Sequence, residues 1–138
     1  MSAKRRDVRE SAFILVFENL FQKDSVDSII ETAAEADEFL INDEVRTLVH
    51  GVCEKADELD NIISRYSNKR AIERIPKINV AILRLAIYEA LYDEKVPVNV
   101  AISEAVALAG KYAQAADVAF VNGILGSYSR SDEAPKDE

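Results

Sequence analysis

INVAILRLAIYEALY, residues 78–92, is apolar on nearly every side of a helical wheel. Asn79, Arg84 and Glu89 interrupt it, and each points in a different direction at about 100° per residue. A helix of this kind is buried all round, so the pattern predicts a central helix wrapped by others. Because charged groups inside a protein need partners, Arg84 and Glu89 are expected to be paired.

The segments before and after this stretch also have helical periodicity. Their boundaries are marked by residues that cap or break helices. Before the central helix we expect a helix over residues 8–21, a short one opened by a Ser28–Glu31 capping box, and a long one from Asn42 to Tyr66. A short basic helix within 67–75 is then ended by Pro76. After the central helix we expect one helix opened by Asn99 and a last one capped by Asp117.

The composition also favours an all-α protein. Of 138 residues, 49% are apolar, while Gly and Pro, which make most tight turns, number only 4 and 3. Without an internal repeat, this predicts a compact bundle of roughly six or seven helices in a single domain, residues 1–130. Residues 131–138 are polar and include Pro135, so a disordered acidic tail is expected there.

The net charge of -8 is distributed unevenly. Between Asp27 and Asp60 there are 11 acidic residues and two basic ones, whereas acids and bases nearly cancel over the rest of the chain. Residues 1–9 form a basic arm in which Asp7 is the only acid; its bases are Lys4, Arg5, Arg6 and Arg9. Such an asymmetry can orient a polyanion on an acidic protein.

Aromatic residues share a face of the first helix with this arm. Arg6, Phe13 and Phe17 lie within roughly 40° of each other on the wheel. Guanidinium groups pair with phosphates and rings stack on bases, so this combination suits single-stranded RNA. Alternatively, both rings belong to the core and the arm is a solvated tip; the wheel favours the core for Phe13 and leaves Phe17 open.

A second basic group follows the long helix. It is more typical of a solubilising surface, although it too could contact a nucleic-acid backbone. Its members are Arg65, Lys69, Arg70, Arg74 and Lys77.

Patterns typical of catalysis, metal binding or cofactor binding are missing from the sequence. His50 and the lone Cys53 lie one turn apart, but an edge histidine and a small core thiol explain them better than chemistry does. Glu89 and Glu104 are likewise better explained as structural carboxylates. Because these patterns are missing, the protein is expected not to be an enzyme and to have no cofactor. No stretch approaches the roughly 20 apolar residues of a membrane span, and no signal peptide is present, which predicts a cytoplasmic protein without a membrane partner.

Three blocks of the sequence resemble the NusB family of bacterial transcription antitermination factors. They are RRDVRESA (5–12), NVAILRLAIYE (79–89), and VPVNVAISEAV (96–106) followed by FVNGIL (120–125). Each block alone is modest, but their order and spacing are specific, and the resemblance extends over nearly the whole globular part.

The resemblance implies two three-helix subdomains and an adaptor without catalysis. Family members bind the single-stranded boxA element of nascent RNA with the small-subunit ribosomal protein that acts as NusE, and they join an antitermination complex on RNA polymerase during ribosomal RNA synthesis. The same partners are therefore expected here. The basic arm and the resemblance together give seven candidate RNA-binding residues: Lys4, Arg5, Arg6, Arg9, Phe17, Lys111 and Phe120.

The chain departs from the family pattern at five positions where basic or polar side chains are common: Asp7, Ser103, Gly110, Ala116 and Ala119. Fewer donors predict a weaker intrinsic RNA affinity and a greater reliance on the ribosomal partner. Two other functions stay open, namely a helical protein–protein scaffold without direct RNA contact and an accessory RNA-handling domain of an RNA methyltransferase system. The sequence does not decide between monomer and dimer.

Asn122 and Gly123 interrupt the apolar run DVAFVNGIL, residues 117–125. Their position within a helix predicts that Gly123 lets the last helix pack closely on the preceding, alanine-lined one. Replacing Gly123 by leucine should then overpack the contact and cost about 1–3 kcal/mol of stability.

Overall fold

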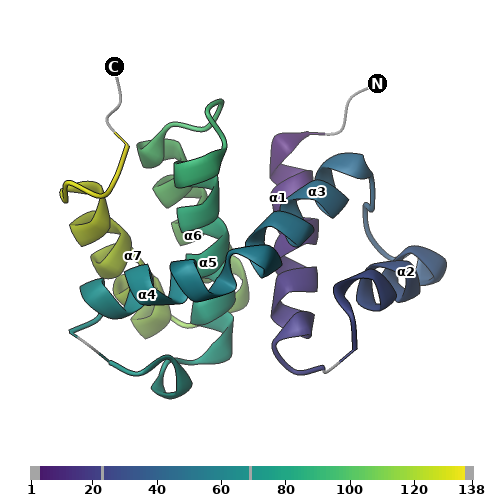
Figure 1. Cartoon of the computed structure of the whole chain (residues 1–138), viewed down its shortest axis with the longest axis horizontal. Coiled ribbons are helices and arrows are strands. Elements are labelled where there is room, and N and C mark those ends of the chain that lie inside the picture. Colours follow the sequence, from purple (N-terminus) through teal and green to yellow (C-terminus); the bar gives the residue numbers. More distant parts are fainter. Residues whose placement is uncertain (1–3, 23, 69, 136–138) are drawn as a thin grey trace. The chain divides into compact units, whose positions relative to one another are not determined.

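The computed structural model describes residues 4–22, 24–68 and 70–135, and over these ranges it contains seven α-helices, one 3-10 turn and no strand (Figure 1). The predicted all-α class and number of helices are confirmed. The chain divides into two compact units, Met1–Glu54 (unit 1) and Lys55–Glu138 (unit 2). The single domain over residues 1–130 therefore stays a prediction.

Unit 1 contains α1 (Arg5–Asn19), α2 (Val26–Ala36) and α3 (Asp43–Glu54), and each of these helices contacts the other two. Its core is formed by one apolar stripe from each helix. The fully or nearly fully buried residues are Val8, Ala12, Phe13, Leu15 and Val16 of α1, Ile29 and Ile30 of α2, and Val45, Leu48, Val49 and Val52 of α3.

The start of α2 differs from the prediction. Ser25 is its N-cap, and the Ser25 hydroxyl accepts a hydrogen bond from the Ser28 backbone N–H at 3.1 Å. The predicted Ser28–Glu31 capping box is therefore wrong by three residues. Two serines with the same spacing to apolar residues compete for the role, and the earlier one adds a further turn of helix.

The predicted long helix from Asn42 to Tyr66 is two helices. Asn42 caps the first as expected, because its side chain accepts from the Val45 N–H at 2.9 Å. That helix ends at Glu54, and α4 (Ala56–Tyr66) begins after Lys55, whose φ of -98° and ψ of 12° are not helical. Periodicity carries no signal for a one-residue break, since apolar residues keep helical spacing on both sides.

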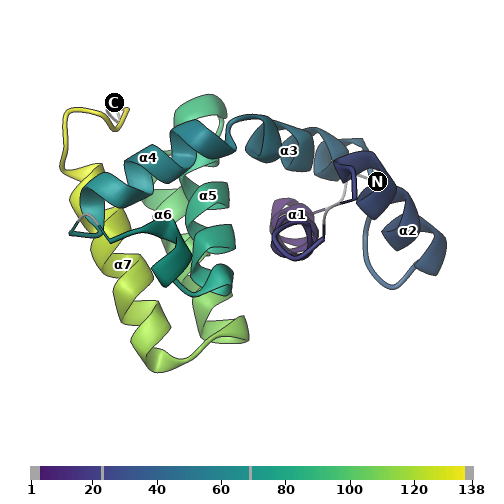
Figure 2. The same cartoon turned by 60° about the horizontal axis from the view of Figure 1, so that its bottom comes forward.

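Unit 2 is built around α5 (Lys77–Tyr92), which contacts α4, α6 (Val98–Tyr112) and α7 (Ala115–Ser129). Figures 1 and 2 show α4 running across α5 and α7. The predicted central helix is confirmed, and so is the need of Arg84 for a partner. Its guanidinium forms two hydrogen bonds of 2.7 Å with the Asp60 carboxylate on α4.

Three helix boundaries in unit 2 differ from the prediction. Instead of the predicted basic helix, the described residues between 67 and 75 form the 3-10 turn Ile72–Arg74. Pro97, not Asn99, is the N-cap of α6. Asp117 is the third residue of α7, where its carboxylate accepts from the Gln114 N–H at 3.0 Å and completes a capping box with the N-cap Gln114.

Gly123 does not make the predicted close contact. It is exposed, and a Cβ placed on it would meet no atom of the described residues within 4 Å. The buried residues of this part of α7 are Val121, Ile124 and Leu125, so Gly123 faces solvent on the opposite side. The predicted overpacking by leucine at Gly123 is therefore wrong.

The chain after α7 returns to α4. The Glu133 carboxylate accepts hydrogen bonds from the Arg65 guanidinium and the Tyr66 hydroxyl, and Ala134 is buried. These donors, Arg65 first, hold the pKa of Glu133 below its usual value. Part of the predicted disordered tail is thus fixed against α4, while its last residues, 136–138, lie outside the described residues.

Tyr128 provides a test of this end of unit 2. Burial, followed by the nearby charge of Glu133, raises the pKa of Tyr128 to about 12. In the unfolded chain a tyrosine ionises near pH 10. Because the folded state holds the phenol neutral, its contribution to stability is complete below about pH 10 and is lost as the pH rises toward about 12.

Tyr128→Phe is expected to remove this alkaline loss. The Tyr128 hydroxyl has no hydrogen-bond partner among the described residues, so its removal should also stabilise the protein by about 1 kcal/mol at pH 8. Urea unfolding at pH 8 and pH 11 measures both effects. The matched control is Tyr112→Phe, because Tyr112 is 36% exposed. Equal pH dependence in the two variants would contradict the assignment.

Candidate nucleic-acid interface

The described part of the basic arm, residues 4–9, forms the N-cap and the first turns of α1 in unit 1. Lys4, in extended conformation, is its N-cap and is exposed, as is Arg6, while Arg5 is half-buried. Arg5 forms an ion pair of 3.2 Å with Glu44 of α3. Arg9 is only 4% exposed. Of the four predicted cations in this unit, Lys4 and Arg6 are therefore the most accessible to a ligand.

Three phenylalanines follow at intervals of four residues, Phe13 and Phe17 on α1 and Phe21 just after its end. Phe13 belongs to the core, as the wheel favoured, whereas Phe17 is half-buried. The ring centroids of Phe13 and Phe17 are 6.0 Å apart in a stacked arrangement. Phe21 lies against Phe17 edge to face at 5.0 Å and is 60% exposed. These three rings, which we call the aromatic row, thus extend from the buried Phe13 to the exposed Phe21.

Phe21 was missed by the sequence reasoning, which placed it in a mostly buried helix. It lies beyond the last residue of α1, Asn19, where the periodic pattern no longer has a core to face. The available signal was its spacing of four from Phe17, together with the polar residues that follow it.

The acidic side of unit 1 provides partners for other basic side chains. Arg46 pairs with Glu31 at 2.6 Å, and His50 lies 2.9 Å from Asp27. The Cys53 thiol is 3.5 Å from the Asn19 amide oxygen. His50 and Cys53 therefore have local structural partners.

In unit 2, Phe120 of α7 is half-buried, and the Arg70 guanidinium lies 5.1 Å from the centre of its ring. Arg70 belongs to the second basic group, which the sequence favoured as a solubilising surface. Lys111, at the end of α6, is exposed and lies 5.4 Å from the Tyr112 ring. The predicted Phe120 therefore has an arginine partner from a different part of the chain.

Phe120 is carried by a firmly anchored helix start. Asp117, one turn earlier, accepts hydrogen bonds from the Gln114 backbone N–H and, at 2.9 Å, from the side chain of Asn79 on α5. These two donors, in that order, hold the pKa of Asp117 below its usual value. The ionised carboxylate ties α7 to α5 and leaves a negative charge close to Phe120, so any anion bound there needs nearby cations.

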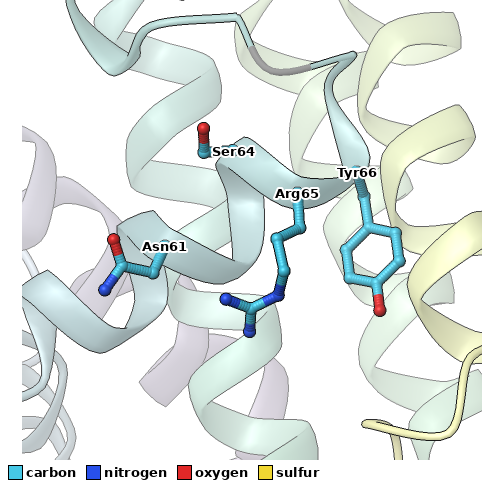
Figure 3. A pocket seen from close by; sticks show the side chains of 4 residues that line it. All are labelled: Asn61, Ser64, Arg65 and Tyr66. Carbon is cyan, nitrogen blue, oxygen red and sulfur yellow. The ribbon is translucent and has the colours of Figure 1, made fainter.

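Arginines line two surface concavities formed by described residues of unit 2. One is lined by Asn61, Ser64, Arg65 and Tyr66 of α4, and Figure 3 shows Arg65 and Tyr66 pointing to the same side of that helix. Its cation is already paired with Glu133. The other is lined by Ser67, Asn68, Arg70, Ala71 and Arg74.

Metal-binding clusters and membrane-spanning helices are both missing from the described residues. They contain no group of three or more His, Cys, Asp or Glu side chains placed to hold a metal ion. None of the helices they form is both long and apolar enough to cross a membrane.

Comparison with known proteins gives a consistent result along the chain. The model of the NusB family matches residues 6–130. Transcription antitermination protein NusB of Ruminiclostridium cellulolyticum is 39% identical over 93% of this chain and 90% of its own length. The protein of the same name from Bacillus subtilis is 40% identical over 90% of this chain and 93% of its own.

Solved structures show the same fold. T. maritima NusB superimposes with a TM-score of 0.86 at 31% identity, covering 98% of this chain and 96% of that one. A chain from the structure of antitermination factors NusB and NusE in complex with dsRNA gives a TM-score of 0.78 at 22% identity, covering 89% and 93%.

Proposed function

The chain belongs to the NusB family, and on this basis we propose that it is a transcription antitermination adaptor that binds boxA-type single-stranded RNA together with the ribosomal protein NusE. In this role it joins the antitermination complex on RNA polymerase and supports ribosomal RNA transcription in the cytoplasm. Its relatives are named as antitermination proteins, so we propose a binding function rather than an enzymatic one.

The first helix gives this proposal its main structural support. Lys4 and Arg6 place positive charge at an accessible helix end, and the aromatic row ends in the exposed Phe21. Phosphate contacts position a strand, and exposed rings stack on its bases. We propose that, in unit 1, Lys4, Arg5 and Arg6 contact phosphates and Phe17 and Phe21 contact bases, with Arg9 as a further member of this site. Lys111 and Phe120 are proposed as RNA-binding residues of unit 2.

The partner is proposed to supply part of the affinity. All five positions at which the chain departs from the family pattern, from Asp7 to Ala119, are exposed. At these positions the surface carries an acid, a hydroxyl, methyl groups or no side chain, instead of basic or amide side chains that could donate hydrogen bonds to RNA. We expect the isolated protein to bind boxA RNA weakly at physiological salt, and the ribosomal protein to strengthen binding.

Arg6→Ala tests the role of the first helix. It is expected to weaken binding of a boxA RNA, in the presence of the ribosomal partner, by at least about tenfold, because a hydrogen bond to a charged group contributes about 1.5–3 kcal/mol. The slope of log affinity against log salt should fall by about 0.7. Fluorescence anisotropy over a series of salt concentrations measures both quantities.

Arg46→Ala is the matched control. It removes the same charge from unit 1, but Arg46 is paired with Glu31 on the acidic side. It should leave affinity and slope nearly unchanged. Equal weakening of RNA binding by the two variants would show that only the net charge of the protein matters. If the wild-type protein with its partner does not bind RNA, the result would favour the protein-only scaffold.

A further inference from the structure

We propose that Arg70 and Arg74 form a second phosphate-binding site for single-stranded RNA in unit 2, in which the Phe120 ring holds the Arg70 guanidinium in position. The inference rests on the proposed RNA-binding function and extends it to residues after α4. It also gives Phe120 a different role from the base contact that the family resemblance implied.

The local backbone brings the two arginines to one concavity. Asn68, just after α4, adopts a left-handed conformation with φ of 57°, which asparagine tolerates better than most residues. The Arg70 N–H then donates to the Ser67 carbonyl at 3.1 Å, and the 3-10 turn that follows closes with Arg74 N–H donating to the Ala71 carbonyl at 2.9 Å. The resulting concavity has a volume of about 510 Å³.

The charges of Arg70 and Arg74 are not neutralised by a carboxylate within the described residues. Both side chains are exposed, and neither forms an ion pair there. Two other arginines of unit 2 differ in this respect, since Arg84 is paired with Asp60 and Arg65 with Glu133. In a chain with a net charge of -8, two unneutralised guanidinium groups beside one concavity are a local exception.

Phe120 keeps one of these groups in a defined place. A guanidinium over an aromatic ring uses its flat face, so the N–H groups in its plane stay directed outward. Those N–H groups match the oxygens of a phosphate, and an already oriented side chain loses less conformational entropy on binding. Phe120 is therefore a positioning residue for Arg70.

The lining favours a nucleic-acid strand over an acidic protein segment. Besides the arginines, the concavity presents the exposed Asn68, whose side-chain amide can donate to a phosphate oxygen, whereas the buried Ser67 hydroxyl donates to the Ser64 carbonyl at 3.3 Å. Its small apolar contribution, Ala71, offers little surface for the hydrophobic anchors that protein interfaces use.

The test measures binding of a single-stranded boxA RNA by the full-length chain with its ribosomal partner. Arg70→Gln combined with Arg74→Gln is expected to weaken binding at least about tenfold and to lower the salt slope by about 1.4, twice the value for one phosphate contact. Arg130→Gln is the control, because Arg130 is an exposed arginine at the end of α7. It should change neither quantity.

The role of Phe120 needs a separate comparison. Phe120→Leu is expected to weaken RNA binding in the wild-type background but to add nothing once Arg70 is glutamine, whereas Phe120→Tyr keeps the ring and should restore binding. Additive losses would show that the ring contacts RNA by itself and would overturn the positioning role. Thermal unfolding of each variant checks that the fold is retained.

The outcomes separate this inference from the proposed function. If the wild-type protein with its partner does not bind RNA, the proposed function fails. If it binds and Arg6→Ala weakens binding while the double variant of Arg70 and Arg74 does not, only the second site is wrong. If the double variant loses the ribosomal protein and keeps RNA, the concavity is a protein-binding site instead.

Discussion

Leu83→Ala is expected to lower the free energy of unfolding of unit 2 by about 2–5 kcal/mol. Leu83 is completely buried on α5, the helix that contacts α4, α6 and α7. Shortening it removes buried apolar surface and leaves a cavity among four helices that cannot all close around it. Because a domain has only about 5–15 kcal/mol of stability in total, the loss would be a large fraction of it.

The distribution of tyrosines makes this effect measurable in one unit. The chain has no tryptophan, and its five tyrosines all lie between Tyr66 and Tyr128, in unit 2. Tyrosine fluorescence during urea unfolding therefore reports on unit 2, while far-UV circular dichroism reports on all helices. We expect the fluorescence transition of Leu83→Ala to move to lower urea.

Val100→Ala serves as the control for this experiment. Val100 is 40% exposed, so its truncation should change stability by less than about 0.5 kcal/mol. A similar loss from Val100→Ala and Leu83→Ala would argue against a core centred on α5.

Asp60→Ala is expected to lower the free energy of unfolding by about 3 kcal/mol. The two hydrogen bonds between Arg84 and Asp60 are both 2.7 Å long, and the two side chains are only 13% and 20% exposed. Removing the carboxylate leaves a largely buried guanidinium without its partner, which costs about 3–5 kcal/mol in a buried site and somewhat less here.

A double variant separates the pair from the loss of one partner. Asp60→Ala combined with Arg84→Met removes both charges, so it should be more stable than Asp60→Ala alone. Arg46→Ala, which breaks an exposed ion pair, should cost less than about 1 kcal/mol. Chemical denaturation of the three variants gives the comparison; a double variant less stable than Asp60→Ala would show that the unpaired guanidinium is not the source of the effect.

The central position of α5 is predictable from sequence because a helix that is apolar on all sides can be satisfied only by neighbours on all sides. The division after Glu54 is not, because a single non-helical residue, Lys55, leaves the apolar spacing intact. Gly123 shows a second feature that sequence patterns do not predict. A glycine in an apolar helix can mean close contact or an open surface, and only the neighbouring elements decide which.

The candidate site likewise has parts that the sequence predicts and parts that it does not. Lys4, Arg5, Arg6 and Phe17 are recognisable because they belong to α1 and its N-cap, so helical periodicity alone relates their positions. The contact between Arg70 and Phe120 joins a turn after α4 to α7, so it depends on tertiary structure that periodicity does not contain. The exposure of a ring at the end of a helix, as for Phe21, also depends on where the core stops.

The ion pair between Arg5 and Glu44 affects the number of phosphate contacts that a salt titration of RNA binding would report. Glu44 already occupies the position of an anion on Arg5, and the pair is exposed enough, at 38% and 51%, to open at little cost. A phosphate that takes this place exchanges one bound anion for another, and the freed carboxylate collects counterions of its own. The stoichiometry deduced from salt titrations would then be lower than the number of phosphates that the protein touches.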